Sequence, residues 1–215
     1  MSDSSEDENS DKSPGGVSRW FSNYLDEIST YLRVTKAQKI LRRYFAMNAF
    51  DGAMTSLGVV IGAYISNISD PRAVIGVIVV SGIAMAVSGF SGTYMTERAE
   101  RSRSLNELED AMLVDLDDTI YGQASRFVSI FAAVVDGSAP FMASVPAVVP
   151  FFLSLAGLCP IGLAFYASVG ACLVTLFLLG VFLGRISEGN LLYSGVKMVV
   201  AGVAVALLAL VLNAH

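Results

Sequence analysis

Five long apolar segments dominate the sequence and restrict the chain to folds that suit a lipid bilayer. Each is close to the roughly 20 residues that a helix needs to cross the hydrocarbon core. Hydrophobic residues make up 54% of the 215 residues and charged residues only 15%, whereas soluble domains contain roughly 45–50% apolar residues. We therefore predict an all-α, polytopic membrane protein with a transmembrane domain at 44–213, whose five spans cover about residues 44–66, 73–95, 127–153, 161–183 and 191–213.

The region before the first span contains two types of sequence. Residues 1–16 are acidic and polar with almost no apolar content, which is typical of a disordered tail. Residues 17–43 place Trp20, Tyr24 and Ile28 at helical spacing, which predicts an amphipathic helix lying in the membrane interface. Packing of this helix against a partner subunit is the alternative. Because the chain opens acidic and polar, we expect no signal peptide and a first span that targets itself.

The basic residues predict an orientation. Five lie between residues 33 and 43, just before the first span, and Arg98, Arg101, Arg103 and Arg126 lie between the second and third spans. The opposite loops carry only Arg72. The positive-inside rule therefore places the N-terminus in the cytoplasm and, after an odd number of spans, the C-terminus outside.

Glycine and proline predict where the spans pack and bend. The third span is expected to be interrupted, because one glycine and three prolines fall within it: Gly137, Pro140, Pro146 and Pro150. Gly58 and Gly62 form a GxxxG pattern in the first span, and the second span is also rich in small residues. These two spans should pack closely, within the subunit or across a dimer.

The first span carries a carboxylate, Asp51, in an otherwise apolar helix. A charge at membrane depth costs at least about 2.5–3.5 kcal/mol on insertion scales, so such a residue indicates function. Four residues share its helix face: Met47, Asn48, Met54 and Thr55. Their oxygen and sulfur donors suit a cation better than an organic substrate. The alternative is that Asp51 reaches the headgroups or caps a neighbouring helix.

Asp136 gives the third span a second carboxylate, in the same Asp-Gly context as Asp51. The glycine after each aspartate lets another backbone approach. Two carboxylates facing one cavity could hold a divalent cation or exchange it for protons, and sulfur from Met54, Met85 or Met142 would favour a transition metal over magnesium or calcium. Alternatively, Asp136 only satisfies backbone N–H groups freed by the prolines, and the methionines only fill space.

The segment at 96–126 between the second and third spans is predicted to be an acidic, helical cytoplasmic loop. Its acidic residues form pairs at i, i+3 that share a helix face, and the candidate metal ligands among them are Glu97, Glu100, Glu107, Asp110 and Asp118. Such a helix could gather cations at the mouth of a pathway. The alternative is a solvated connecting helix stabilised by ion pairs with the interspersed arginines.

Several functions are not expected. The sequence contains one histidine, His215, and no GxSxG, Walker or HExxH motif, so we do not expect an enzyme. Cys159 and Cys172 lie in or beside apolar segments and form no CxxC pair, which argues against a disulfide framework or a thiolate metal site. No basic patch with interleaved aromatics indicates a nucleic-acid partner, and no resident cofactor is expected.

Three stretches resemble the vacuolar iron transporter and nodulin-like family. Residues 50–62 are similar to its Asp-Gly-x-x-(Thr/Ser)-x-x-(Leu)-x-x-Gly opening, and residues 84–90 to its Ser-Met-Ala-x-Gly-Glu-Tyr stretch. Residues 137–150 and 197–202 are similar to its Gly-x-x-x-Pro and Arg-Met-x-x-x-Gly segments. The resemblance covers about residues 40–213, as a short-loop, prokaryotic-type member.

The resemblance implies a homodimer that exports Fe(II), and in some members Mn(II), from the cytoplasm in exchange for protons. It places Asp51 and Met85 on the path between subunits and assigns Glu-x-x-Glu-type metal binding to Glu107 and Asp110. The chain departs from the family in lacking the glutamate of Gly-Glu-Tyr, in a loop too short for the full metal-binding domain, and in having Asp136 where an apolar residue is expected.

Two functional hypotheses follow from the sequence. The first is a secondary transporter that exports a divalent transition metal by proton antiport, with Asn48, Asp51, Met54, Met85 and Asp136 on the path. The second is a non-transporting membrane scaffold or metal-sensing subunit on the same fold. We expect an integral protein of a prokaryotic, and specifically archaeal, cell membrane, or of a vacuole-type membrane if the source is eukaryotic.

Overall fold

Five helices make up the part of the chain that the structure, a computed structural model, describes: residues 31–32, 37–187 and 189–213. They are α2 (Gln38–Ile65), α3 (Pro71–Met112), α4 (Ile120–Leu155), α5 (Ile161–Ile186) and α6 (Leu191–Asn213). All five are long and apolar enough to cross a membrane. For the described residues, the prediction of an all-α fold with five helices long and apolar enough to cross a membrane is confirmed. By the length and composition of these helices the chain is an integral membrane protein. The predicted tail at 1–16 and residues 17–30 and 33–36 of the predicted interfacial helix lie outside the described residues.

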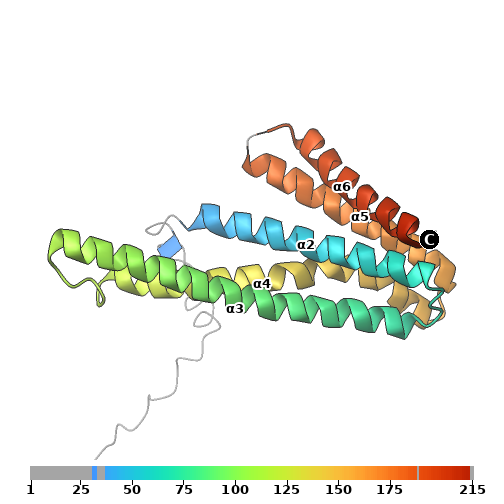
Figure 1. Ribbon diagram of the computed structural model, residues 1–215, viewed down its shortest axis with the longest axis horizontal. Helices are drawn as coiled ribbons and strands as arrows, with labels where there is room; N and C mark the ends of the chain where they lie inside the picture. Colours follow the sequence, from blue (N-terminus) through green and yellow to red (C-terminus); the bar gives the residue numbers. More distant parts are fainter. Residues whose placement is uncertain (1–30, 33–36, 188, 214–215) are drawn as a thin grey trace, which may run out of the picture.

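Helices α2, α3 and α4 form one group, and α5 and α6 form a hairpin beside it (Figure 1). Helices α2 and α4 are central, because α4 packs against α2, α3 and α5, and α2 contacts all four other described helices. Many buried positions at these contacts are alanines, and small side chains let helix backbones approach closely in a membrane. The buried core cluster includes the alanines Ala49 and Ala53 of α2 and Ala139, Ala143 and Ala147 of α4.

Local chemistry sets several helix ends. Asp70 caps α3 by accepting a hydrogen bond from the Arg72 backbone N–H at 2.9 Å, and Pro71 follows at the first helical position. Leu113 ends α3 in the left-handed conformation at φ 53°. Gly157, with φ +75°, makes the turn after α4, where a side chain would be strained.

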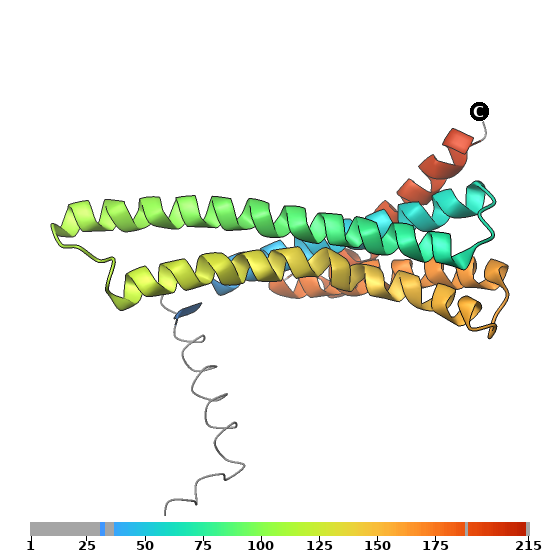
Figure 2. The same cartoon turned by 90° about the horizontal axis from the view of Figure 1, so that it is seen from below.

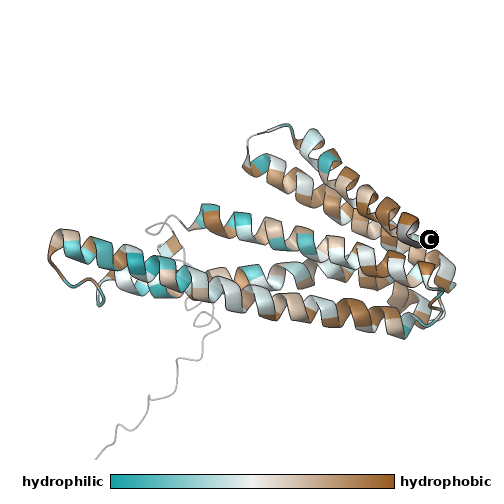
Figure 3. Ribbon diagram, in the orientation of Figure 1, coloured by the Kyte–Doolittle hydropathy of each residue, from teal (hydrophilic) through white to brown (hydrophobic). Residues whose placement is uncertain are grey.

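Two helices are longer than the spans predicted from hydropathy. Helix α2 begins at Gln38, so residues 38–43 of the predicted interfacial helix belong to the first spanning helix. Helix α3 is 42 residues long and continues past the predicted end of the second span to Met112. The predicted loop at 96–126 therefore consists of the charged ends of α3 and α4 with a short connection between them. Figure 3 shows this end of both helices as hydrophilic and the rest as mainly hydrophobic.

The expectation that glycine and proline interrupt the third span is wrong. Helix α4 is one helix through Pro140, Pro146 and Pro150. Figure 2 shows that it curves along its length, which is what proline in a helix commonly causes. A bend is less costly than a break here because packing on three neighbouring helices holds α4 in place.

Candidate cation site between α2, α3 and α4

A cavity of about 270 Å³ gathers most of the predicted path residues. It lies in the charge-poor part of the bundle, and three helices line it. Helix α2 contributes Asn48 and Asp51, and α4 contributes Asp136. Helix α3 contributes five residues that recur at helical spacing: Met85, Ser88, Gly89, Gly92 and Thr93.

Asp136 is the buried carboxylate of this cavity and is 2% exposed. One of its oxygens accepts a hydrogen bond from the Asn48 side-chain amide and the other accepts one from the Thr93 hydroxyl. Both donors are neutral, and no Lys or Arg among the described residues forms an ion pair with Asp136. The network therefore ties α2, α3 and α4 together at one carboxyl group that has no cationic partner among the described residues.

The glycines that follow the two aspartates lie where helices cross most closely. A Cβ atom added at Gly52 would lie 2.4 Å from the backbone oxygen of Pro140 in α4, and one added at Gly137 would lie 2.7 Å from the backbone oxygen of Ala86 in α3. The prediction that each glycine admits a neighbouring backbone is confirmed. Next to the two aspartates, the first crossing therefore joins α2 to α4 and the second joins α4 to α3.

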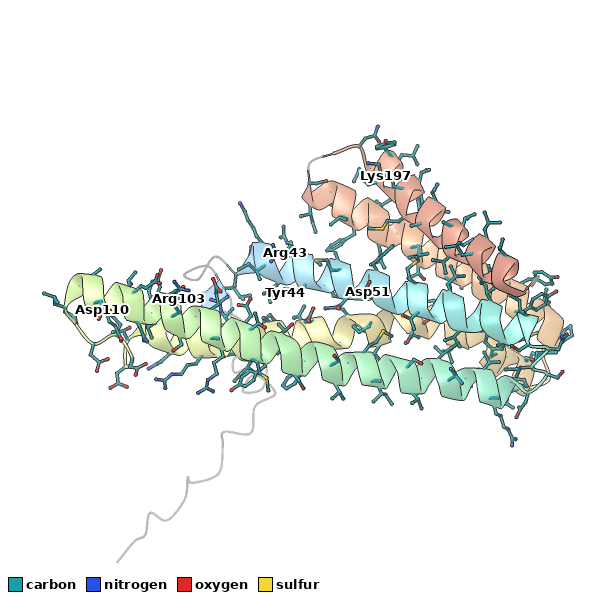
Figure 4. All side chains as sticks on the ribbon, viewed as in Figure 1. Arg43, Tyr44, Asp51, Arg103, Asp110 and Lys197 are labelled. Carbon is teal, nitrogen blue, oxygen red and sulfur yellow. The ribbon has the colours of Figure 1, made fainter. Side chains whose placement is uncertain are left out.

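Asp51 differs from Asp136 in its surroundings. It is exposed on the bundle surface, and it forms no hydrogen bond or ion pair with any residue that the structure describes. Figure 4 shows Tyr44 and Asp51 on the side of α2 that faces α3. The cavity therefore offers one carboxylate held by hydrogen bonds and a second that is free to bind.

The remaining path candidate and two glycines lie outside the cavity. Met54 packs against the hydrophobic core cluster instead of lining the cavity. Nothing lies within 4 Å of a Cβ atom added at Gly58 or Gly62. The GxxxG pair therefore does not pack within the described subunit, and its packing across a dimer stays a prediction.

Some acidic residues in the part of α3 beyond the predicted span (residues 96–112, the α3 extension) form ion pairs with arginines. Glu97 is buried, accepts a hydrogen bond from the Tyr44 hydroxyl at 2.8 Å, and pairs with Arg101 at 3.0 Å. Glu107 pairs with Arg103 at 2.9 Å, and both side chains are exposed.

The other predicted acidic ligands are exposed and do not converge. Glu100 shares a cavity of about 390 Å³ with Glu97. Asp110 lies near the end of α3 (Figure 4), and Asp118 lies on the connection to α4. Among the described residues no group of three or more His, Cys, Asp or Glu side chains could hold a metal. Metal binding by this segment stays a prediction.

The cavity has the donor set of a cation site. Two carboxylates, the amide oxygen of Asn48 and the hydroxyls of Ser88 and Thr93 are oxygen donors, and Met85 adds a thioether. Oxygen donors alone suit Mg²⁺ or Ca²⁺, and a thioether shifts the preference toward a transition metal. All of these donor types are found in divalent-cation sites of proteins.

Sequence reasoning missed Thr93 and Ser88. Both lie on the face of α3 that carries Met85, at i+8 and i+3, so helical spacing from Met85 could have found them. Their pairing with the third span could not have been found in this way, because it depends on which faces meet.

The chain is similar to the uncharacterized protein MJ0645 of Methanocaldococcus jannaschii. The two are 36% identical over 170 residues, which cover 77% of this chain and 85% of the relative. The chain belongs to the family of MJ0645. No protein-family model matches the chain, and no solved structure matches it.

Family membership places the chain beside an archaeal relative whose name states no activity. Membership in the vacuolar iron transporter family therefore stays a prediction.

Proposed function

We propose that the protein is a secondary transporter that moves a divalent transition metal, Fe(II) or Mn(II), out of the cytoplasm in exchange for protons. The observation that carries the proposal is the convergence of Asp51, Met85 and Asp136 from three helices on one cavity. Two carboxylates within apolar helices are costly unless they serve a function or meet a partner. A divalent cation supplies the positive charge that both lack among the described residues.

Asp51 is the exchanging ligand in this proposal. Because it has no bonding partner in the described subunit, it can bind the cation from the cytoplasmic side and release it when a proton takes the cation's place. Asp136 stays in the cavity wall as the second carboxylate, oriented by Asn48 and Thr93. Met85 contributes the soft donor that discriminates against Mg²⁺.

A second copy of the chain covers Asp51 in this proposal. The cavity lies on the bundle surface, and an ionised carboxylate facing lipid costs at least about 2.5–3.5 kcal/mol. A homodimer that joins two such surfaces removes this cost and brings two free carboxylates together, which gives a doubled site with four carboxylates from two subunits.

The orientation with the N-terminus in the cytoplasm and the C-terminus outside belongs to the same proposal. It is supported by the basic residues before α2 and between α3 and α4. The end of α6 lies at the opposite end of the bundle from the charged ends of α3 and α4 (Figure 1). We place the protein in an archaeal-type cell membrane, with the acidic extension of α3 gathering cations at the cytoplasmic mouth.

The test is metal-dependent proton flux in proteoliposomes containing the purified protein. Fe(II), Mn(II), Co(II), Zn(II) and Mg(II) are compared for wild type, Asp51→Asn and Asp70→Asn. The last is a matched control, because it makes the same chemical change in a loop residue, and asparagine caps a helix as well as aspartate does. We expect transition metals to drive proton flux in wild type and in Asp70→Asn. Asp51→Asn should reduce it at least about tenfold, which corresponds to about 1.4 kcal/mol of lost ligand binding.

A non-transporting scaffold or metal-sensing subunit is the second candidate. The ion pairs of Glu97 and Glu107 favour the scaffold, because they engage two of the acidic side chains that would otherwise gather cations. Folded, dimeric wild-type protein that drives no flux with any metal would support this candidate and reject transport. Unchanged flux in Asp51→Asn would reject the role of Asp51 while keeping transport.

A further inference from the structure

A second cavity lies between α3 and α4, where both helices pass from apolar to charged sequence. Its volume is about 560 Å³. Three arginines line it, Arg98 and Arg101 from α3 and Arg126 from α4, together with serine hydroxyls and Asp117. Its chemistry is therefore opposite to that of the acidic cavity around Asp51.

The charges of this cavity do not cancel. Arg101 pairs with Glu97 at 3.0 Å and Arg126 pairs with Asp117 at 2.9 Å. Arg98 instead donates a hydrogen bond to the Tyr94 hydroxyl at 2.6 Å and lies over the same ring, and it has no carboxylate partner among the described residues. One positive charge remains, and a guanidinium group is well suited to bind phosphate.

An apolar groove of about 500 Å³ follows the same α3–α4 seam. On α3, Val87 and Phe90 of the groove are followed by Tyr94 and Arg98 of the cavity at steps of three or four residues. The rings of Phe90 and Tyr94 stack at 6.3 Å, where the groove meets the cavity. Groove and cavity therefore form one continuous strip on one helix face.

Helix α4 shows the same register. Val134 of the groove is followed toward the N-terminus by Ile130 and Arg126 of the cavity at steps of four. On α3 the strip runs from Ile83 to Arg98, which is about 22 Å at 1.5 Å per residue. One leaflet with its headgroups is about 20–22 Å thick.

We propose that this seam binds an anionic phospholipid, with the phosphate at Arg98 and Arg126 and an acyl chain in the groove. The single excess positive charge complements one phosphodiester, and the polar-to-apolar order along the strip matches the order along a lipid. Basic pockets between membrane helices near the surface are a known mode of headgroup recognition. The site lies outside the proposed transport path, and its occupancy does not depend on transport.

The test is native mass spectrometry of the detergent-solubilised protein with phosphatidylglycerol and with phosphatidylcholine of the same chain length. Wild type should retain phosphatidylglycerol in preference to phosphatidylcholine. Arg98→Gln combined with Arg126→Gln should lower its affinity about tenfold or more, since two charge-assisted hydrogen-bond donors are lost. Arg103→Gln is the matched control, because Arg103 lies on the same helix outside the cavity.

Arg98→Gln alone serves as the second variant, because Arg98 is exposed and its loss breaks no ion pair. It should lower phosphatidylglycerol affinity several-fold. The proposal would be overturned if the double variant and Arg98→Gln retained phosphatidylglycerol as well as Arg103→Gln does.

A groove variant distinguishes a lipid from a free anion. Val87→Phe combined with Val134→Phe fills the groove at two exposed positions, and Val80→Phe is an exposed control on α3 outside it. We expect the filled groove to abolish the preference for phosphatidylglycerol and the control to keep it. If the groove variant still retains phosphatidylglycerol, and millimolar inorganic phosphate displaces the lipid, the cavity is a free-anion site. That result would overturn the lipid assignment.

Discussion

The contact between Gly52 of α2 and the backbone of Pro140 in α4 lies beside the carboxylate cavity, and its replacement by alanine tests the packing that positions the site. A Cβ atom at position 52 would lie 2.4, 2.5 and 2.8 Å from the O, Cα and C atoms of Pro140. Carbon atoms in contact prefer about 3.5–4.0 Å, so the two helices must separate by roughly 1 Å. Because all three atoms belong to the backbone, no side chain can rotate away.

The magnitude follows from three effects. Overpacking of a tight contact costs about 1–3 kcal/mol, and the better helix propensity of alanine returns up to about 1 kcal/mol. Separation of α2 from α4 also strains the bond between Asn48 and Asp136, one turn away on α2, and an unpaired buried polar group costs about 1–3 kcal/mol. We expect Gly52→Ala to lower the free energy of unfolding by about 2–4 kcal/mol, which corresponds to a Tm lower by roughly 5–15 °C.

The assay is thermal unfolding in detergent, followed by the loss of helical signal, with Gly170→Ala in α5 as the matched control. Nothing lies within 4 Å of a Cβ atom added at Gly170, so the control should keep its Tm or raise it slightly. Equal Tm values for Gly52→Ala and Gly170→Ala would refute the close crossing of α2 and α4.

Three further predictions concern the site and its surroundings. Asp136→Leu should lower stability by about 2–4 kcal/mol, because it leaves the part-buried Asn48 amide and the buried Thr93 hydroxyl without their acceptor; thermal unfolding against Asp136→Asn, which retains an acceptor, measures this. Glu97→Gln should cost about 3 kcal/mol, because Arg101 is only 13% exposed and would lose its counter-ion, and chemical unfolding should show partial recovery when Arg101→Gln is added, whereas no recovery would mean that the pair itself contributes little. Gly62→Trp should leave the folded subunit intact, because open space surrounds the position, but should shift dimer to monomer in light scattering; an unchanged dimer would exclude this face as the interface.

Much of the fold could be predicted from hydropathy, because the length of an apolar segment is a local property. The predicted spans at 161–183 and 191–213 begin at the same residues as α5 and α6. The first three helices extend past their predicted spans, because polar residues such as Glu97 and Arg101 continue a helix without contributing to its hydropathy. The interruption predicted for α4 did not occur, since tertiary packing decides whether a proline breaks or bends a helix.

The candidate site divides in the same way. Asp51 and Asp136 could be identified from the sequence, because a carboxyl group in an apolar helix is conspicuous whatever surrounds it. Met85 was singled out among the membrane methionines by the resemblance to a known family. Their meeting in one cavity with Asn48 could only be proposed, because spacing along one helix does not specify which neighbouring helix it faces. The role of Thr93 was not accessible, because nothing in the second span alone indicates a hydrogen bond to a carboxylate 43 residues away.

Residue type and spacing along the chain are enough to identify five segments long and apolar enough to cross a membrane and two carboxylates within them, because both properties are local to single helices. Only the packed arrangement of the helices shows which carboxylate is bonded and which is free, that Glu97 pairs with Arg101 while also accepting a hydrogen bond from Tyr44, and that Gly52 rather than Gly58 admits a neighbouring helix. These facts depend on which helix faces meet. In a membrane that choice is set by close packing and by satisfaction of polar groups, not by hydrophobicity, since the lipid is as apolar as the helices.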